Sequence, residues 1–229
     1  MTAGSGSVQG RSARVRVALI HALAHSVAPI NAAFERDWPD ATRMNLLDDS
    51  LSADLDASPA GLDARMTERF LALAGYALDT GAQGILFTCS AFGPCIDAVK
   101  RRWPDVPVLK PNEAMIEEAA RIGGRIGLVS SFAPTLASMP AEFPANITLT
   151  CSLAEGALEA LDRGDVDTHD ALVARAAERI AAQCDAIALA QFSLARAAPA
   201  VERVVGVPVL TTPGSAVQAL RRQMARATV

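Results

Sequence analysis

The sequence predicts an α/β protein made of two similar halves, each with a largely parallel sheet. Short apolar runs alternate with longer segments of helical periodicity, as they do in βαβ units. In addition, one stretch of the chain can be laid over a later stretch. The 229 residues are 51% hydrophobic and 20% charged, which is enough for a buried core and excludes a disordered chain.

Six short apolar runs have the composition of buried strands, and these are Val15–Ile20, Gly84–Thr88, Val106–Leu109, Arg125–Val129, Ala186–Ala190 and Val207–Leu210. Between them, two helices have clear signals. Asp63–Leu78 has apolar residues at helical spacing and is followed by Gly81, a typical stop. Asp167–Cys184 has the same spacing, with Thr168 as a candidate N-cap.

An internal repeat supports the two halves. Residues 84–109 align with 186–210, an offset of 102 that puts Cys89 opposite Gln191. Residues 16–22 align with 125–131 at the similar offset of 109. A shared apolar strand and turn is the simpler alternative, but matching strand, turn, helix and second strand favours a duplication of about 100 residues.

Ligands of parallel sheets bind beyond the carboxyl ends of the strands, so the residues after each apolar run are the candidates for a site. We expect them to surround a cleft between the two halves, a common place for small-molecule sites. In chain order they are His21, Thr88, Cys89, Ser90, Ser130, Ser131, Phe132, Gln191, Phe192 and Ser193.

Cys89 is the candidate with the most reactive side chain. It lies in the segment TCSAFG, between a predicted strand and a predicted helix. Backbone N–H groups and the helix dipole at such a position favour the thiolate over the thiol. The alternative is that Cys89 is a small buried hydrophobic residue, which is the usual role of a cysteine after an apolar strand.

Three further polar residues have open roles. His21 ends the first strand, where it can orient a substrate carboxylate, act as an acid or base, or be satisfied by backbone groups. Asn45 and Asp48 lie in or near the segment NLLDDSLSADL, which either contributes polar groups to the cleft or caps a helix.

Several classes of protein and cofactor are not expected. A sequence pI near 5.4 and 4% aromatic residues do not suit nucleic-acid binding. No long apolar run predicts a membrane span, and the four cysteines form no CxxC pair, which fits a reducing cytoplasm. There is no Walker motif, no GxGxxG motif and no metal-ligand cluster, so we expect neither nucleotide nor metal. Residues 1–13 have the composition of a mobile leader.

The segments ILFTCSAFG and VPVLKPNEAMIEEA, together with the duplicated halves, resemble the aspartate/glutamate racemase superfamily over about residues 14–225. This superfamily includes hydantoin racemases, maleate isomerase and arylmalonate decarboxylase. The resemblance implies two pseudo-symmetric Rossmann-like domains with the active-site cleft between them, no cofactor and a possible homo-oligomer. The domains it implies are 14–112 plus 211–229, and 113–210.

Racemases of this superfamily use a cysteine from each half to exchange the α-proton of a carboxylate substrate. Cys89 matches the first cysteine, whereas Gln191 occupies the second position and cannot exchange a proton at neutral pH. Three hypotheses follow. The protein is a racemase or isomerase in which Cys89 works with another group such as His21 or adds to a double bond, a decarboxylase with one cysteine, or an inactive binding protein.

In each case the substrate is a small carboxylate. Since no arginine lies in the strand-end loops, we expect neutral donors to hold its anionic group. The predicted donors are Thr88, Ser90, Ser130, Ser131 and Ser193, with Asn45 and Asp48 as weaker candidates.

Overall fold

The computed structural model describes residues 14–59 and 61–227, so the leader predicted over residues 1–13 lies outside the described residues. The chain forms two four-stranded sheets in which every pair of neighbouring strands is parallel. The first sheet contains β1 (Arg16–His21), β2 (Thr42–Leu47), β3 (Gly84–Phe87) and β4 (Val108–Leu109). The second contains β5 (Arg125–Ser130), β6 (Thr148–Leu153), β7 (Ala186–Leu189) and β8 (Val209–Thr211).

The two sheets have the same topology, as the internal repeat predicts. Their strand orders are β2-β1-β3-β4 and β6-β5-β7-β8. The α/β class with two Rossmann-like halves is therefore confirmed.

Strands β2 and β6 were not predicted. Each lies at the edge of its sheet, and their sequences, TRMNLL and TLTCSL, mix polar with apolar residues. An edge strand is covered incompletely, so it needs no continuous apolar run. Apolar runs alone therefore predict the two central strands and one edge strand of each sheet, and they do not reveal the other edge strand.

Helices connect the strands. The first half has η1 (Ala24–Ser26), α1 (Val27–Asp37), α2 (Ser50–Asp56), α3 (Ala64–Asp79), η2 (Ser90–Phe92) and α4 (Gly93–Arg102). The second half has α5 (Glu113–Ile122), α6 (Ala133–Ser138), η3 (Met139–Glu142), α7 (Ala157–Asp162), α8 (Val166–Ala181), η4 (Ser193–Ala197) and α9 (Ala198–Glu202), and α10 (Thr212–Ala227) ends the chain.

The two predicted helices are present, and one N-cap differs from its prediction. The carboxylate of Asp63 accepts a hydrogen bond from the Met66 amide at 2.7 Å, so α3 begins where the sequence indicates. In α8 the N-cap is Asp165, whose carboxylate accepts a 3.2 Å hydrogen bond from the Thr168 amide. Thr168 therefore lies inside the first turn, and its predicted capping role was wrong.

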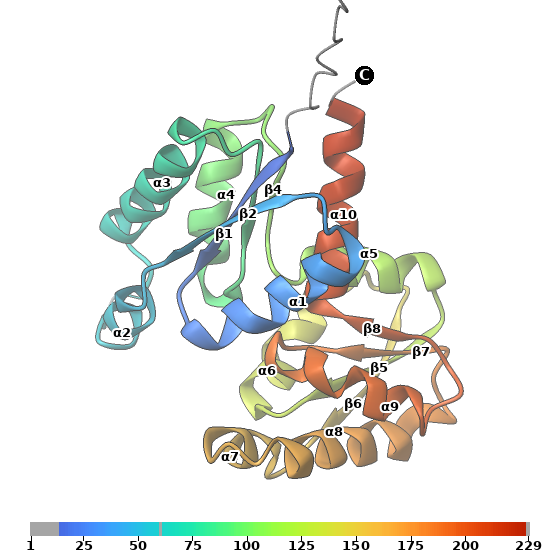
Figure 1. Ribbon diagram of the computed structural model, residues 1–229. Helices are drawn as coiled ribbons and strands as arrows, with labels where there is room; N and C mark the ends of the chain where they lie inside the picture. The colour runs from blue at the N-terminus through green and yellow to red at the C-terminus, as the bar shows by residue number, and fades with distance from the viewer. Residues whose placement is uncertain (1–13, 60, 228–229) are drawn as a thin grey trace, which may run out of the picture.

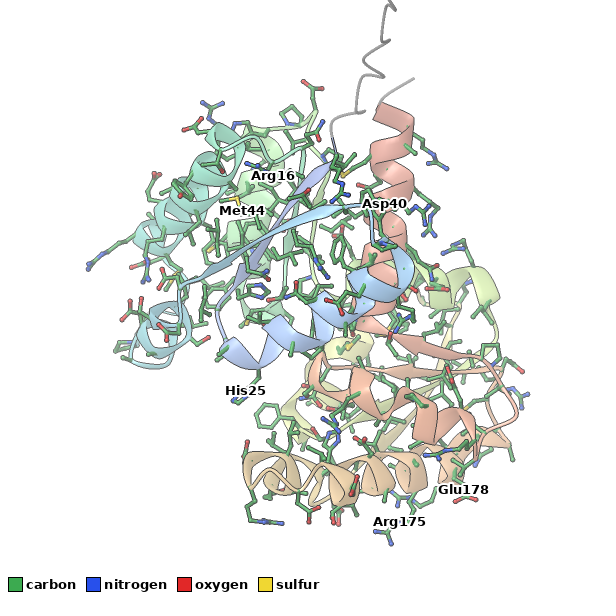
Figure 2. The ribbon with its side chains drawn as sticks, viewed as in Figure 1. Arg16, His25, Asp40, Met44, Arg175 and Glu178 are labelled. Atoms are coloured by element: carbon green, nitrogen blue, oxygen red, sulfur yellow. The ribbon has the colours of Figure 1, made fainter. Side chains whose placement is uncertain are left out.

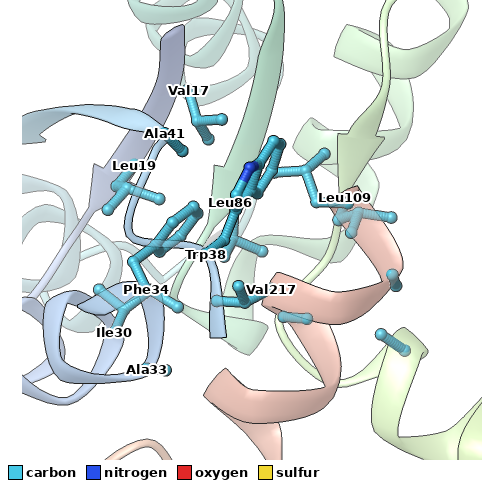
Figure 3. Close-up of a cluster of buried hydrophobic side chains, with 14 of the residues drawn as sticks. Val17, Leu19, Ile30, Ala33, Phe34, Trp38, Ala41, Leu86, Leu109 and Val217 are labelled. Atoms are coloured by element: carbon cyan, nitrogen blue, oxygen red, sulfur yellow. The ribbon is translucent and has the colours of Figure 1, made fainter. Parts of the chain in front are cut away.

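Each sheet is covered by helices on both faces. Figure 1 shows α3 and α4 on one side of the first sheet, with α1 and α10 on the other. The cluster under α1 and α10 contains Leu19, Phe34, Trp38, Leu86 and Val217, all buried (Figure 3). In the second half, α8 and α9 cover one face, and α5 with the η3 segment covers the other.

Helix α10 connects the halves. It follows β8 of the second sheet, and then packs against α1 and β3 of the first half. A Cβ atom added to Gly84 in β3 would lie 2.9 Å from the Met224 sulfur, so the helix approaches the strand closely. On this packing we base the proposed division into 14–112 plus 211–229, and 113–210.

Candidate functional site

The candidate residues lie at equivalent points of the two sheets. In each sheet the chain passes from one central strand to one edge, and from the other central strand to the opposite edge. The place between these two central strands is called the switch point, and ligands bind there in the crevice at the carboxyl ends of the strands. In the first sheet this point lies between β1 and β3, which end at His21 and just before Thr88 and Cys89. In the second it lies between β5 and β7, near Ser130 and Gln191.

His21 is the centre of a buried hydrogen-bond network in the first half. Its Nε2 atom lies 3.0 Å from Asn45 Oδ1, and its Nδ1 atom lies 2.9 Å from Thr88 Oγ1 and 3.2 Å from Ser26 Oγ. Asn31 donates a second hydrogen bond to Asn45 Oδ1 at 3.0 Å. The imidazole is completely buried, and both of its ring nitrogens have hydrogen-bond partners in the protein.

The tautomer of His21 follows from these contacts. Asn45 Oδ1 is an acceptor only, so Nε2 carries the proton and donates to it. Nδ1 is then an acceptor, and Thr88 Oγ1 donates to it, while Ser26 Oγ donates to the Leu23 carbonyl at 2.8 Å. Burial lowers the pKa of His21, and the hydrogen bond to Asn45 offsets this only in part. His21 is therefore neutral, and it holds Thr88 in place from beneath.

Cys89 lies just beyond Thr88, at the N-cap position of the η2 turn, and is partly exposed. Burial raises the pKa of its thiol, and a hydrogen bond from the Ala91 backbone lowers it by less. The expected amide contact is present, but the expected preference for the thiolate is not, because the cost of burying charge is larger. The resting side chain is a neutral thiol.

Asp48 directly follows β2, and Ser90 is the third residue after β3. The pKa of Asp48 is raised by partial burial, but hydrogen bonds from Ser50 and Arg69 outweigh this effect and lower it. Its Oδ2 atom lies 2.7 Å from Arg69, which also pairs with Asp54, so Asp48 is an ion-paired carboxylate. Ser90 is exposed at the start of η2.

The second half has a group built around Gln191. Its Oε1 atom accepts hydrogen bonds from the Ser130 hydroxyl at 2.9 Å, the Ser131 backbone amide at 2.8 Å and the Ser131 hydroxyl at 3.0 Å. An amide N–H donates only, so the contact with Ser131 fixes which end of the Gln191 amide is oxygen. The Nε2 end has no hydrogen-bond partner among the residues that the structure describes.

Ser193 is separated from these two groups. It begins η4 and lines a cavity of about 740 Å³ between the halves, together with residues of α1, β8 and the start of α10. His25 lines the same cavity, and Figure 2 shows it pointing from the first half toward the second. Cys89 and Gln191 are not among the residues that line it. A cavity between the halves is thus present, but Ser193 is the one predicted site residue among those that line it.

The structure brings the predicted residues together in two groups. His21, Asn45 and Thr88 are joined by hydrogen bonds, with Cys89 next in the chain. Ser130, Ser131 and Gln191 form the second group.

Four polar residues near the candidates were not predicted. Ser26 and Asn31 join the His21 network, Arg69 pairs with Asp48, and Lys110 pairs with Asp97. Lys110 directly follows β4 and so had the strand-end signal used for the others. Its Nζ atom lies 2.7 Å from Asp97. The other three are on or just before helices, where the sequence carries no such signal.

Two further features concern metals and membranes. Among the described residues, no three His, Cys, Asp or Glu side chains are grouped closely enough to hold a metal ion. Within the same part of the chain, no helix is both long and apolar enough to cross a bilayer.

The sequence profile of the Asp/Glu/Hydantoin racemase family matches residues 22–220. No curated protein sequence matches the chain significantly.

Solved structures of similar fold include a glycine-to-cysteine mutant of arylmalonate decarboxylase in a sulfate-associated form. It has 23% identity and a TM-score of 0.67 over 92% of this chain and 93% of that one. Allantoin racemase from Klebsiella pneumoniae has 19% identity and a TM-score of 0.65 over 93% and 88%. Glutamate racemase from Francisella tularensis in complex with D-glutamate has 14% identity and a TM-score of 0.64 over 94% and 82%. These similarities show the fold.

Proposed function

The chain belongs to the Asp/Glu/hydantoin racemase family, and from this premise we propose that it is a cofactor-independent racemase or isomerase of a small carboxylate, with Cys89 as the reacting group. The observation that carries the proposal is the position of Cys89. It is partly exposed directly after Thr88 at the β1–β3 switch point, where ligands of such sheets bind.

In the proposed reaction the Cys89 thiolate removes the proton from the carbon next to the carboxylate. The C–H electron pair moves onto the carboxylate as an enediolate. Return of a proton from the thiol restores the same face and gives hydrogen exchange, whereas inversion requires a proton from water on the opposite face. With an unsaturated substrate, the thiolate adds to the double bond instead and leaves after rotation. Since burial raises the pKa of the thiol, the reactive thiolate forms only in a fraction of molecules at neutral pH.

An enediolate needs hydrogen-bond donors that are in place before the reaction. Exposed Ser90 and the Nε2 end of Gln191 are candidates. The hydroxyls of Ser130 and Ser131 already donate to Gln191 Oε1, so they act by holding that amide in place. His21 has no free ring nitrogen, so we propose that it acts by positioning Thr88 and Cys89. Ser193 becomes a weaker candidate because it lines the separate cavity, and Asn45 and Asp48 remain weaker candidates for binding.

A second candidate function is decarboxylation with Cys89 as the proton donor. The observations that favour it are the neutral resting thiol of Cys89 and the presence of a glutamine, which cannot exchange protons, at the equivalent position beyond β7. The bond between carbon and carboxylate breaks, CO2 leaves, and the electron pair stays as an enediolate. The Cys89 thiol then gives its proton to carbon from one side.

Proton NMR in D2O tests both functions with the full chain and the Cys89→Ser variant. The substrates are aspartate, glutamate, hydantoins, maleate and arylmalonates. We expect wild type to exchange, isomerise or decarboxylate at least one compound and the variant to be slower by about 10²-fold or more. Equal rates in both proteins would remove Cys89 from the reaction. Binding without any conversion by either protein would indicate an inactive binding protein.

A further inference from the structure

The cavity of about 740 Å³ between the two halves is separate from the residues around Cys89. Its walls come from α1 of the first half, from η4 and α9 of the second half, and from the start of α10. Its volume lies within the range of about 300–1,000 Å³ that is usual for ligand pockets. His21, Thr88 and Cys89 are not among the described residues that line it. A ligand in this cavity would therefore leave the proposed catalytic site unoccupied.

Each half contributes one arginine to the cavity. Arg36, near the end of α1, donates to the Asp37 carboxylate from Nε at 2.8 Å and from Nη2 at 2.6 Å. Arg196, in η4, donates to the Asp170 carboxylate from the same two atoms, at 3.0 Å and 3.4 Å. Within the described chain, neither Nη1 atom has a hydrogen-bond partner. Each guanidinium is thus held along one edge, and its other edge is open to a second carboxylate.

The start of α10 leaves room for Arg36. A Cβ atom added to Gly214 would lie 3.3 Å from Arg36 Nη2 and 2.7 Å from Thr211 Oγ1. The absence of a side chain at Gly214 therefore lets the guanidinium lie against this helix. The Gly214 amide already donates to Thr211 Oγ1 at 3.2 Å, so this end of the helix is capped. The group that is open to an anion here is the arginine.

A buried histidine holds the partner of Arg196. His169 lies on α8 and is fully buried, with its Nδ1 atom 2.7 Å from Asp170 Oδ1. A carboxylate oxygen accepts only, so Nδ1 donates to it. The same oxygen accepts the hydrogen bond from Arg196 Nε. Two donors thus fix the Asp170 carboxylate, and this carboxylate orients Arg196.

One acidic side chain of the cavity is uncommitted. Asp37 pairs with Arg36, and Glu118 Oε2 accepts a hydrogen bond from the Ser215 hydroxyl at 2.5 Å. Glu202, on α9, has neither a hydrogen bond nor an ion pair with any other residue that the structure describes. The hydrogen bond to Asp37 is the main cause of the raised pKa of Arg36, and the charge of Glu202 adds to it. Glu202 of the second half therefore lies near Arg36 of the first.

We propose that this cavity is a second binding site, which takes a zwitterion of about the size of a dipeptide. The carboxylate of the ligand binds the open edges of Arg36 and Arg196, and its ammonium group pairs with Glu202. Its side chains pack against the small apolar residues of the walls, which include Ala28, Ala32 and Ala195. A single amino acid would leave most of the volume to water. This site goes beyond the proposed function, because no part of it uses Cys89.

Binding of L-alanyl-L-alanine to the full-length protein tests the proposal. Saturation-transfer difference NMR compares it with the N-acetylated dipeptide, which lacks the ammonium group, and with the dipeptide amide, which lacks the carboxylate. We expect the dipeptide to bind at least about tenfold more tightly than either analogue, since each analogue loses a charge-assisted hydrogen bond. Equal binding of all three compounds would overturn the proposal, and so would the absence of saturable binding of the dipeptide up to about 10 mM.

Two substitutions test where the charged ends of the ligand lie. Arg196→Gln should weaken binding of the dipeptide by about tenfold and leave binding of the amide unchanged. Glu202→Gln should weaken binding of the dipeptide and leave binding of the N-acetylated compound unchanged. Arg203→Gln is the matched control, because Arg203 is exposed beside Glu202 at the end of α9 but does not line the cavity. Equal losses in Arg196→Gln and Arg203→Gln would contradict the proposed site.

The Cys89→Ser variant distinguishes the two sites of the protein. It should bind the dipeptide as tightly as wild type, because Cys89 does not line the cavity. Binding that depends on Cys89 and not on Arg196 would place the dipeptide at the proposed catalytic site and overturn the second site. Turnover of a carboxylate that depends on Cys89 tests the proposed function alone, so each proposal can fail while the other stands.

Discussion

The two switch points occupy equivalent places in equivalent sheets, yet they differ in chemistry. Cys89 and Gln191 are each the second residue beyond their strands, β3 and β7. In the first half, a buried neutral histidine supports a group that can gain and lose a proton. In the second half, two serines hold an amide in a fixed orientation.

This difference separates the two tasks that a proton-exchange site must perform. In the proposed reaction, Cys89 would supply an ionisable group, and Gln191 would supply a donor that cannot change its charge. Inversion at carbon needs an acid on one face and a base on the other. With a single proton-exchanging side chain at the paired positions, we expect the side chains of the proposed site to transfer protons from one side only.

The largest expected effect comes from making the two halves alike. Gln191→Cys places a second thiol at the position that pairs with Cys89, so inversion of the reacting carbon should increase by about 10²-fold. Chiral chromatography of a converted substrate measures this. Gln191→Ser is the matched control, since a serine hydroxyl does not ionise near neutral pH. Equal inversion by both variants would mean that the second position takes no part in proton transfer.

Much of this comparison was accessible from the sequence. The repeat put Cys89 opposite Gln191, and the rule on strand ends found His21, Thr88, Ser130 and Ser131. The network beneath them was not accessible, because Asn31 lies in α1 and meets Asn45 only when β2 pairs with β1. The raised pKa of Cys89 was also missed, because it depends on burial that the local sequence does not report.

A second test compares the contribution of each group to stability. His21→Ala removes a fully buried ring and leaves Thr88 and Asn45 without their partner, so the free energy of unfolding should fall by about 3 kcal/mol. Gln191→Ala removes a half-buried amide, and the Ser130 hydroxyl can still donate to the Phe132 carbonyl at 3.0 Å, so we expect a loss of about 1 kcal/mol. Urea denaturation monitored by circular dichroism measures both. We assign His21 as the structural group and Gln191 as the group that faces the site. A larger loss of stability for Gln191→Ala than for His21→Ala would contradict this assignment.

The smallest effect is the pH dependence of stability that His21 produces. Its pKa in the folded state is below the ordinary value of 6.5, so the unfolded chain binds the extra proton more readily as the pH falls through that value. Stability should therefore fall from pH 7 to pH 5, by at most about 1.4 kcal/mol per pH unit from this group. Asp48 acts in the same direction but at lower pH, because a carboxylate with a lowered pKa loses stability only below its ordinary value of 3.8.

The window from pH 5 to pH 7 thus isolates the histidines, and substitution isolates His21 among them. In urea denaturation, His21→Gln should have a shallower slope than wild type, while Gln191→Ala should keep the wild-type slope because Gln191 does not titrate. His25 and His169 are present in all three proteins, so their contributions cancel. Equal slopes for wild type and His21→Gln would mean that His21 takes up its proton in the folded state as readily as in the unfolded chain. His21 would then be charged in the folded protein below its ordinary pKa of 6.5. The first half would contain two titrating groups, Cys89 and His21, whereas Gln191 in the second half does not titrate.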